Sequence, residues 1–175
     1  SSNIMMCTIR LEHELNTALA IMQQDIRRAG YNSQALKATT NGFANPFTLT
    51  DVSDLTLVGD SCLLFSYDLN QTGELPDLNT TPNDDRFGFR LVDNTLQSRA
   101  KHDSVFSCTE GTWYDLTNND LFSIDNLQFT LTTTNVDTTQ VRVIGIELTG
   151  SLLLDPTVKR TLQTKVKIRN DKSVS

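Results

Sequence analysis

The sequence predicts an α+β fold, in which one long N-terminal α-helix packs on an antiparallel β-sheet. In residues 4–29, apolar residues recur at steps of three and four, which is the period of a helix with one buried face. After residue 60, several segments alternate apolar and polar residues, which is the period of a strand with one buried face. The strand-like segments follow the helix as a group instead of alternating with helices, and this order favours α+β over α/β.

The helix is expected over about residues 4–29. We predict that its packing face consists of Leu11, Leu15, Met22 and Ile26. Gly30 offers the left-handed residue that ends many helices, which marks the C-terminal end. No comparable start signal precedes Ile4, and the apolar stripe is already complete there. We therefore expect the helix to continue upstream, and part of it to project beyond the sheet.

The rest of the 175-residue chain is expected to complete a single domain. Residues 31–60 are rich in Asn, Thr and Asp and predict a variable loop with one short strand near residues 54–58. A β region follows over about residues 61–170. Within it, Asp93-Asn94 separates two strand-like runs and is a strong two-residue hairpin signal. We expect one antiparallel sheet of two hairpin systems, with the helix covering one face and water covering the other.

The three cysteines indicate an oxidising compartment. Cys62 opens an apolar run, Cys108 lies between two strand-like segments, and Cys7 lies in the helical pattern. We predict a Cys62–Cys108 disulfide, and the alternative is a cytosolic protein with reduced thiols. Zinc is not expected, because there is no CxxC pair and the two histidines are far apart in the sequence.

The charge distribution argues against a general nucleic-acid binder. The net charge is −6, and no Lys or Arg occurs between Lys37 and Arg86, while the end of the chain is basic. One local candidate for DNA binding is the basic face of the last long strand, formed by Lys165, Lys167 and Arg169. The competing interpretation is a solvated outer face, whose lysines discourage unwanted pairing at a sheet edge.

A calcium loop is the one cofactor candidate. Asp68, Asn70 and Thr72 place oxygen-bearing side chains at the first, third and fifth positions of a run with Gly73 at the sixth. The bidentate acid at the twelfth position is missing, since Asn79 occupies it. An Asx-type turn in a solvated acidic loop is the favoured interpretation, and no cofactor is required.

We expect no enzymatic activity. The run from His102 to Ser104 has the residue types of a catalytic triad, but neighbours in an extended chain point apart. The pair Asp84-Asp85 fails as a carboxylate dyad for the same reason. A phosphate-binding glycine loop is also absent from the sequence.

Four segments resemble PilW-type minor type IV pilins. Residues 15–31 are similar to the helix end of that family, where a run of this kind closes with an aspartate, a basic pair, a small residue, glycine and an aromatic residue. Residues 59–68, residues 86–91 and the region from residue 148 to residue 171 are similar as well. The resemblance covers nearly the whole chain. It departs at the front, where the prepilin signal and the apolar half-helix are absent, and in the loop 36–54.

The resemblance implies a pilin-like fold in which residues 1–175 form one periplasmic domain and the membrane half of the helix is truncated. It implies a structural minor pilin that helps to initiate type IV pilus assembly at the tip of the fibre. The implied partners are other minor pilins, the major pilin, the inner membrane and, for the full-length precursor, prepilin peptidase. The protein would be anchored in the inner membrane before it enters the pilus. The alternatives are a J-type minor pseudopilin of a type II secretion system and an adhesive or DNA-binding tip module.

Overall fold

The computed structural model describes residues 2–50, 53–81 and 83–173 of the chain. The helical segments are α1 (Ser2–Ile26), α2 (Ala35–Thr40) and the 3-10 turn η1 (Pro46–Thr48). The strands are β1 (Thr56–Val58), β2 (Cys62–Ser66), β3 (Arg86–Val92), β4 (Thr95–Arg99), β5 (Trp113–Asp115), β6 (Phe122–Val136), β7 (Thr139–Leu152), β8 (Lys159–Lys167) and β9 (Lys172–Ser173).

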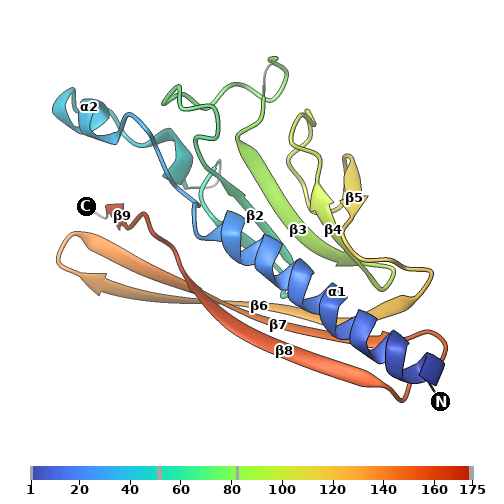
Figure 1. The fold of residues 1–175 in the computed structure, drawn as a ribbon. Coiled ribbons are helices and arrows are strands. Elements are labelled where there is room, and N and C mark those ends of the chain that lie inside the picture. Colours follow the sequence, from blue (N-terminus) through green and yellow to red (C-terminus); the bar gives the residue numbers. More distant parts are fainter. Residues whose placement is uncertain (1, 51–52, 82, 174–175) are drawn as a thin grey trace.

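The strands form two antiparallel sheets (Figure 1). The first has the order β1-β2-β3-β4-β5, and the second has the order β6-β7-β8, with β9 pairing one end of β7. The β3–β4 hairpin turns at Asp93 and Asn94, whose φ angles are 50° and 58°. Two successive positive φ angles are what a type I′ turn requires, so the hairpin predicted from this pair is confirmed.

Helix α1 lies across the second sheet and runs between the two sheets in Figure 1. Leu11, Leu15, Met22 and Ile26 on its packing face are fully buried. The helix passes so close to β7 that a Cβ on Gly150 would lie 2.9 Å from Cδ2 of Leu15 and 3.2 Å from Cδ1 of Leu11. Glycine at this position therefore allows the close approach of helix and strand.

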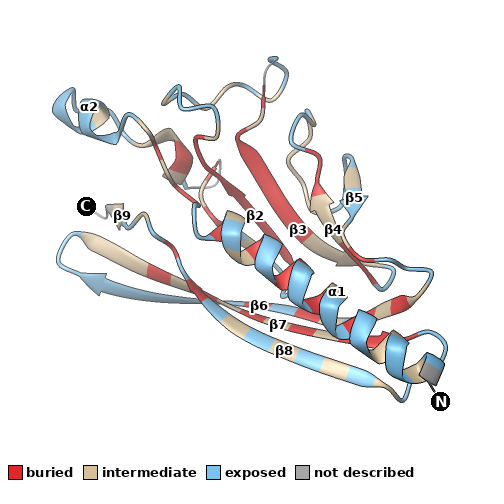
Figure 2. Ribbon diagram, in the orientation of Figure 1, coloured by how far each residue is buried: buried red, intermediate tan, exposed pale blue. Residues whose placement is uncertain are grey.

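Side chains from α1 and from both sheets share one apolar core. Its aromatic part is a stack in which the rings of Tyr67 and Phe87 lie 4.0 Å apart and nearly parallel. Figure 2 shows the buried residues gathered on the inner side of α1 and along β2 and β3, while the outer side of α1 is exposed. The core thus fixes the helix to both sheets along one side only.

The expectation of an α+β fold with one antiparallel sheet is wrong, because the structure is mostly β and has two separate antiparallel sheets. Alternation of apolar and polar residues indicates that a strand has a buried face, but it does not identify the neighbouring strand. The first sheet closes with the short strand β5, and the chain then enters the second sheet through residues 116–121. The segment predicted as a variable loop also contains α2 and η1 in addition to β1.

Candidate assembly surface

The N-terminal end of α1 exposes large apolar side chains that the core does not use. Met5, Met6 and Ile9 are 68%, 64% and 64% exposed. They lie off the buried stripe that begins in full at Leu11. Single exposed apolar residues are common, but three within two turns of one helix indicate a surface for contact with another molecule.

The turn between β7 and β8 adds two more exposed leucines beside this helix end. Leu153 is 49% exposed and Leu154 is 70% exposed. A hollow of about 380 Å³ connects this turn to the first turns of α1, and its lining includes Cys7 and Arg10. Together, five exposed side chains form the N-terminal apolar patch: Met5, Met6, Ile9, Leu153 and Leu154.

Polar contacts at Glu12 and Gln23 hold α1 in place on the second sheet. Oε1 of Glu12 pairs with Nε of Arg160 in β8 at 2.9 Å. Further along, the side-chain amide of Gln23 donates to the hydroxyl of Thr164 at 2.7 Å. These contacts flank the buried stripe and fix the rotation of the helix, so the N-terminal apolar patch has a defined direction.

The C-terminal end of α1 lies within residues 15–31, the segment that resembles the helix end of minor pilins. The hydroxyl of Tyr67 donates to Oδ1 of Asp25 at 3.2 Å, and the guanidinium of Arg28 lies 4.8 Å from the centre of the Tyr67 ring. Burial raises the pKa of Asp25, and the hydrogen bond from Tyr67 opposes that rise. Gly30, with φ of 78°, donates its N–H to the carbonyl of Ser66 at 2.8 Å. The motif therefore joins the helix to the end of β2.

The structure contains the disulfide expected between Cys62 and Cys108, with a sequence separation of 46 residues. It ties β2 to the segment between β4 and β5. Arg90 supports this segment, because its Nη1 donates to the carbonyl of Cys108 at 2.8 Å. The same guanidinium lies 4.3 Å from the centre of the Trp113 ring. Cys7 is a free thiol.

The candidate calcium loop is organised as a turn. Asp68 is 1% exposed, and its two carboxylate oxygens accept hydrogen bonds from the backbone N–H groups of Ser33, Thr72 and Gly73. Oδ1 of Asn70 accepts from both the N–H and the hydroxyl of Thr72. The N–H groups that donate to these oxygens occupy the positions from which a cation would be bound, and their partial positive charges would repel it. In the part of the chain that the structure describes, no cluster of three or more His, Cys, Asp or Glu residues is arranged to hold a metal ion.

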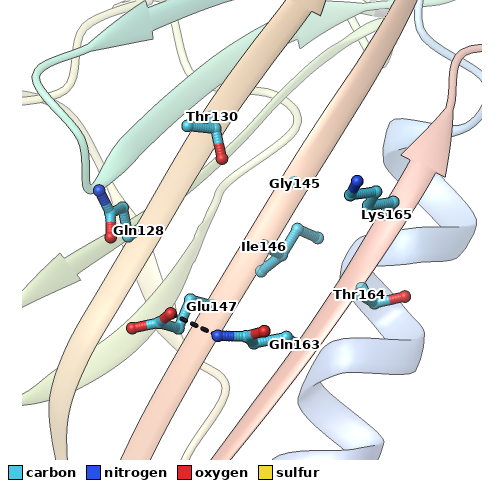
Figure 3. A pocket seen from close by; sticks show the side chains of 8 residues that line it. All are labelled: Gln128, Thr130, Gly145, Ile146, Glu147, Gln163, Thr164 and Lys165. Carbon is cyan, nitrogen blue, oxygen red and sulfur yellow. Dashed lines mark hydrogen bonds between the residues drawn. The ribbon is translucent and has the colours of Figure 1, made fainter.

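The candidate DNA-binding residues are exposed, but the structure does not bring all three together. Lys165 lies on the outer face of the second sheet, with Gly145 of β7 between it and Thr130 of β6 (Figure 3). On the same face, Gln163 and Glu147 share a 2.7 Å hydrogen bond. Arg169 instead borders the end of α1, where its N–H donates to the carbonyl of Arg27. DNA binding through these residues stays a prediction.

The residues weighed for catalysis have other partners. Nδ1 of His102 lies 2.6 Å from Oδ1 of Asp84, not against Asp103. The carboxylate of Asp103 accepts hydrogen bonds from the N–H groups of Thr112 and Val105. These bonds lower the pKa of Asp103, with the bond from Thr112 contributing most. The geometry gives these residues a role in shaping the loop before β5.

Sequence reasoning identified the buried stripe of α1 but missed the N-terminal apolar patch. The signal was present as apolar residues outside the buried stripe, at Met5, Met6 and Ile9, and as the run of three leucines that starts at the last residue of β7. Such residues have no place in a pattern that describes only one face. Their exposure becomes visible once the sheets are placed on the other side of the helix.

Comparison with known proteins agrees with a pilus-related protein. A family model described as prepilin peptidase-dependent protein B matches residues 5–168. An uncharacterized protein of Haemophilus influenzae is 22% identical over 204 residues, which cover 96% of this chain and 83% of that protein. No solved structure matches the chain. None of the described helices has the length and apolar character needed to cross a membrane. Because the family model spans nearly its whole length, the chain belongs to the prepilin peptidase-dependent protein B family.

Proposed function

We propose that this protein is a structural, non-enzymatic minor pilin that helps to initiate type IV pilus assembly at the tip of the fibre. Family membership supports processing of its precursor by prepilin peptidase and a role in a pilus or a related secretion fibre. The proposed partners are other minor pilins and the major pilin. The proposed location is the inner membrane, with the described domain in the periplasm, followed by the pilus.

The observation that carries this proposal is the N-terminal apolar patch on a helix whose opposite side is already buried. Burying a large apolar side chain contributes about 1.5–3 kcal/mol. Three such side chains, Met5, Met6 and Ile9, could therefore stabilise packing against neighbouring subunits by several kcal/mol without any change in the domain itself. A helix that uses one side for its own core and the other for its neighbours suits a fibre subunit.

The experiment uses the full-length precursor in a piliated bacterium that lacks its own copy. We expect Ile9→Asp to reduce the number of surface pili, counted by electron microscopy, at least tenfold, because the charge would have to be buried between subunits. Asn16→Asp is the matched control, since Asn16 is exposed on the same helix and lies outside the patch. The amount of processed protein, measured by immunoblot, should be equal for both variants.

A crosslinking measurement identifies the neighbours. A cysteine in place of Ile9, in a Cys7→Ser background, should crosslink to pilins of the same fibre. Normal piliation by Ile9→Asp together with no crosslink to any pilin would refute the proposal. Crosslinks to pseudopilins of a type II secretion system would replace the pilus with that shorter fibre.

A further inference from the structure

One edge of the second sheet is open along the second part of β6. Near its start, this edge is covered by turns of the first sheet, because the N–H of Ile124 donates to the carbonyl of Asn94 and the N–H of Phe129 donates to the carbonyl of Asp60. Beyond Phe129 the β6–β7 hairpin extends past the first sheet (Figure 1), and β9 pairs with its β7 side. On the β6 side, residues 131–136 are all exposed (Figure 2). Residues 131–136 form the open edge of the second sheet.

The backbone groups that face outward on the open edge can be identified from the register. The N–H of Phe129 points away from β7, and alternate residues of a strand direct their N–H and C=O groups to the same side. The N–H and C=O groups of Leu131, Thr133 and Asn135 therefore point outward as well. Within the described residues, no turn or loop supplies a backbone hydrogen bond to these three. The open edge thus presents three unpaired donors and three unpaired acceptors in a row.

The open edge also lacks the features that protect other sheet edges. Charged side chains and very short strands discourage pairing with other chains. The outer strands of the first sheet, β1 and β5, have three residues each. The other long edge, β8, carries Lys159, Lys165 and Lys167. Residues 126–136 contain no charged side chain and are rich in threonine. Among the described strands, β6 is therefore the long edge without protection by charge.

The charges at the two ends of the open edge indicate which kind of strand fits. Asp60 is exposed at the end near Phe129, and Asp137 is exposed at the hairpin turn. A second copy of β6 paired antiparallel about Thr133 would bring Asp137 of each copy toward Asp60 of the other. Like charges placed this way disfavour self-pairing, whereas basic residues in a different strand would complement both aspartates.

We propose that the open edge binds an extended segment of a partner polypeptide by strand addition, and that this segment has an uncharged, β-branched run with a basic residue at each end. Backbone hydrogen bonds would supply the affinity, as in other cases of strand addition, and the two aspartates would select the partner and its register. This interaction surface is separate from the N-terminal apolar patch. It does not depend on the proposed role in pilus initiation.

The test uses the peptide Lys-Thr-Val-Thr-Val-Thr-Lys and the 175-residue chain. Peptide binding should slow amide hydrogen exchange, measured by NMR, at least tenfold at Leu131, Thr133 and Asn135. Thr132 and Thr134 should change little, because their N–H groups already pair with β7. No slowing at the three outward amides with millimolar peptide would overturn the proposal.

Substitutions separate edge pairing from unfolding. Thr133→Pro should weaken peptide binding at least tenfold while leaving the melting temperature nearly unchanged, because it removes an N–H that has no partner within the chain. Thr133→Val keeps that N–H and should bind as the original chain does. Equal binding of a peptide with Asp at both ends would overturn the charge assignment. A concentration-dependent dimer that Thr133→Pro abolishes would show a second copy, not a partner, on the edge.

Discussion

Removal of the Cys62–Cys108 disulfide tests how far the first sheet depends on a covalent link. The two cysteines are separated by 46 residues, and the chain-entropy model gives about 4 kcal/mol for closing a loop of that size. For a domain of 150–250 residues, each kcal/mol corresponds to roughly 2–4 °C in melting temperature. We therefore expect the melting temperature to fall by roughly 8–16 °C when the link is lost.

The assay is thermal unfolding followed by circular dichroism. The oxidised chain is compared with the reduced chain and with the double variant Cys62→Ala and Cys108→Ala, which avoids placing a hydroxyl at the buried position 62. Cys7→Ser is the control, since Cys7 is outside the disulfide and should change the melting temperature by no more than about 2 °C. A thiol-reactive label should modify one cysteine, Cys7, in natively exported protein.

The outcome distinguishes a structural link from an incidental one. A fall of less than about 2 °C would refute the reasoning, because it would mean that the link does not restrict the unfolded chain as the model requires. Three labelled thiols in exported protein would refute the pairing itself. Reduction should also speed amide exchange around Cys108, where Arg90 holds the segment through a single backbone carbonyl.

The remaining predictions concern the core, a buried acid and a helix end. Leu15→Asp and Met22→Asp should each destabilise the domain by at least about 3 kcal/mol, because both side chains are fully buried, and unchanged melting would contradict this. Burial raises the pKa of Asp85, so its ionised form costs stability above the unfolded value near 4. Asp85→Asn should therefore raise the melting temperature at pH 7, and this gain should vanish as the pH falls below about 4 in a pH series. Gly30→Ala should cost about 1 kcal/mol or more in urea unfolding, because φ is 78° and the added methyl would lie 2.9 Å from Cγ2 of Thr48; equal stability would exclude that strain.

The sequence predicted local structure correctly where a residue pattern is typical of one kind of structure. Asp93 and Asn94 predicted a hairpin because few other residues adopt two successive positive φ angles. The buried stripe of α1 followed from helical spacing alone. The pairing of Cys62 with Cys108 followed from which segments around the cysteines were strand-like.

The division of the strands into two sheets could not be predicted from the sequence in the same way. All five residues of β2 are buried, so the strand shows no alternation that would assign its faces. One face contacts the core through Leu63 and Phe65, and on the other the hydroxyl of Ser66 donates to the carbonyl of Ser53. The second face is therefore covered by the segment before β1, which the sequence presented as a variable loop.

The separation between the two sides of α1 has a consequence for how variants should behave. The stripe from Leu11 to Ile26 supports the fold, whereas Met5, Met6 and Ile9 contact little of the domain. Changes in the stripe should lower stability and thereby reduce the amount of protein available for assembly. Changes at the three exposed positions should leave stability intact and act only on assembly. Because the open edge lies on β6 and not on α1, its loss should affect neither stability nor assembly. The three classes of variant can therefore be distinguished by measuring melting temperature, pilus number and peptide binding together.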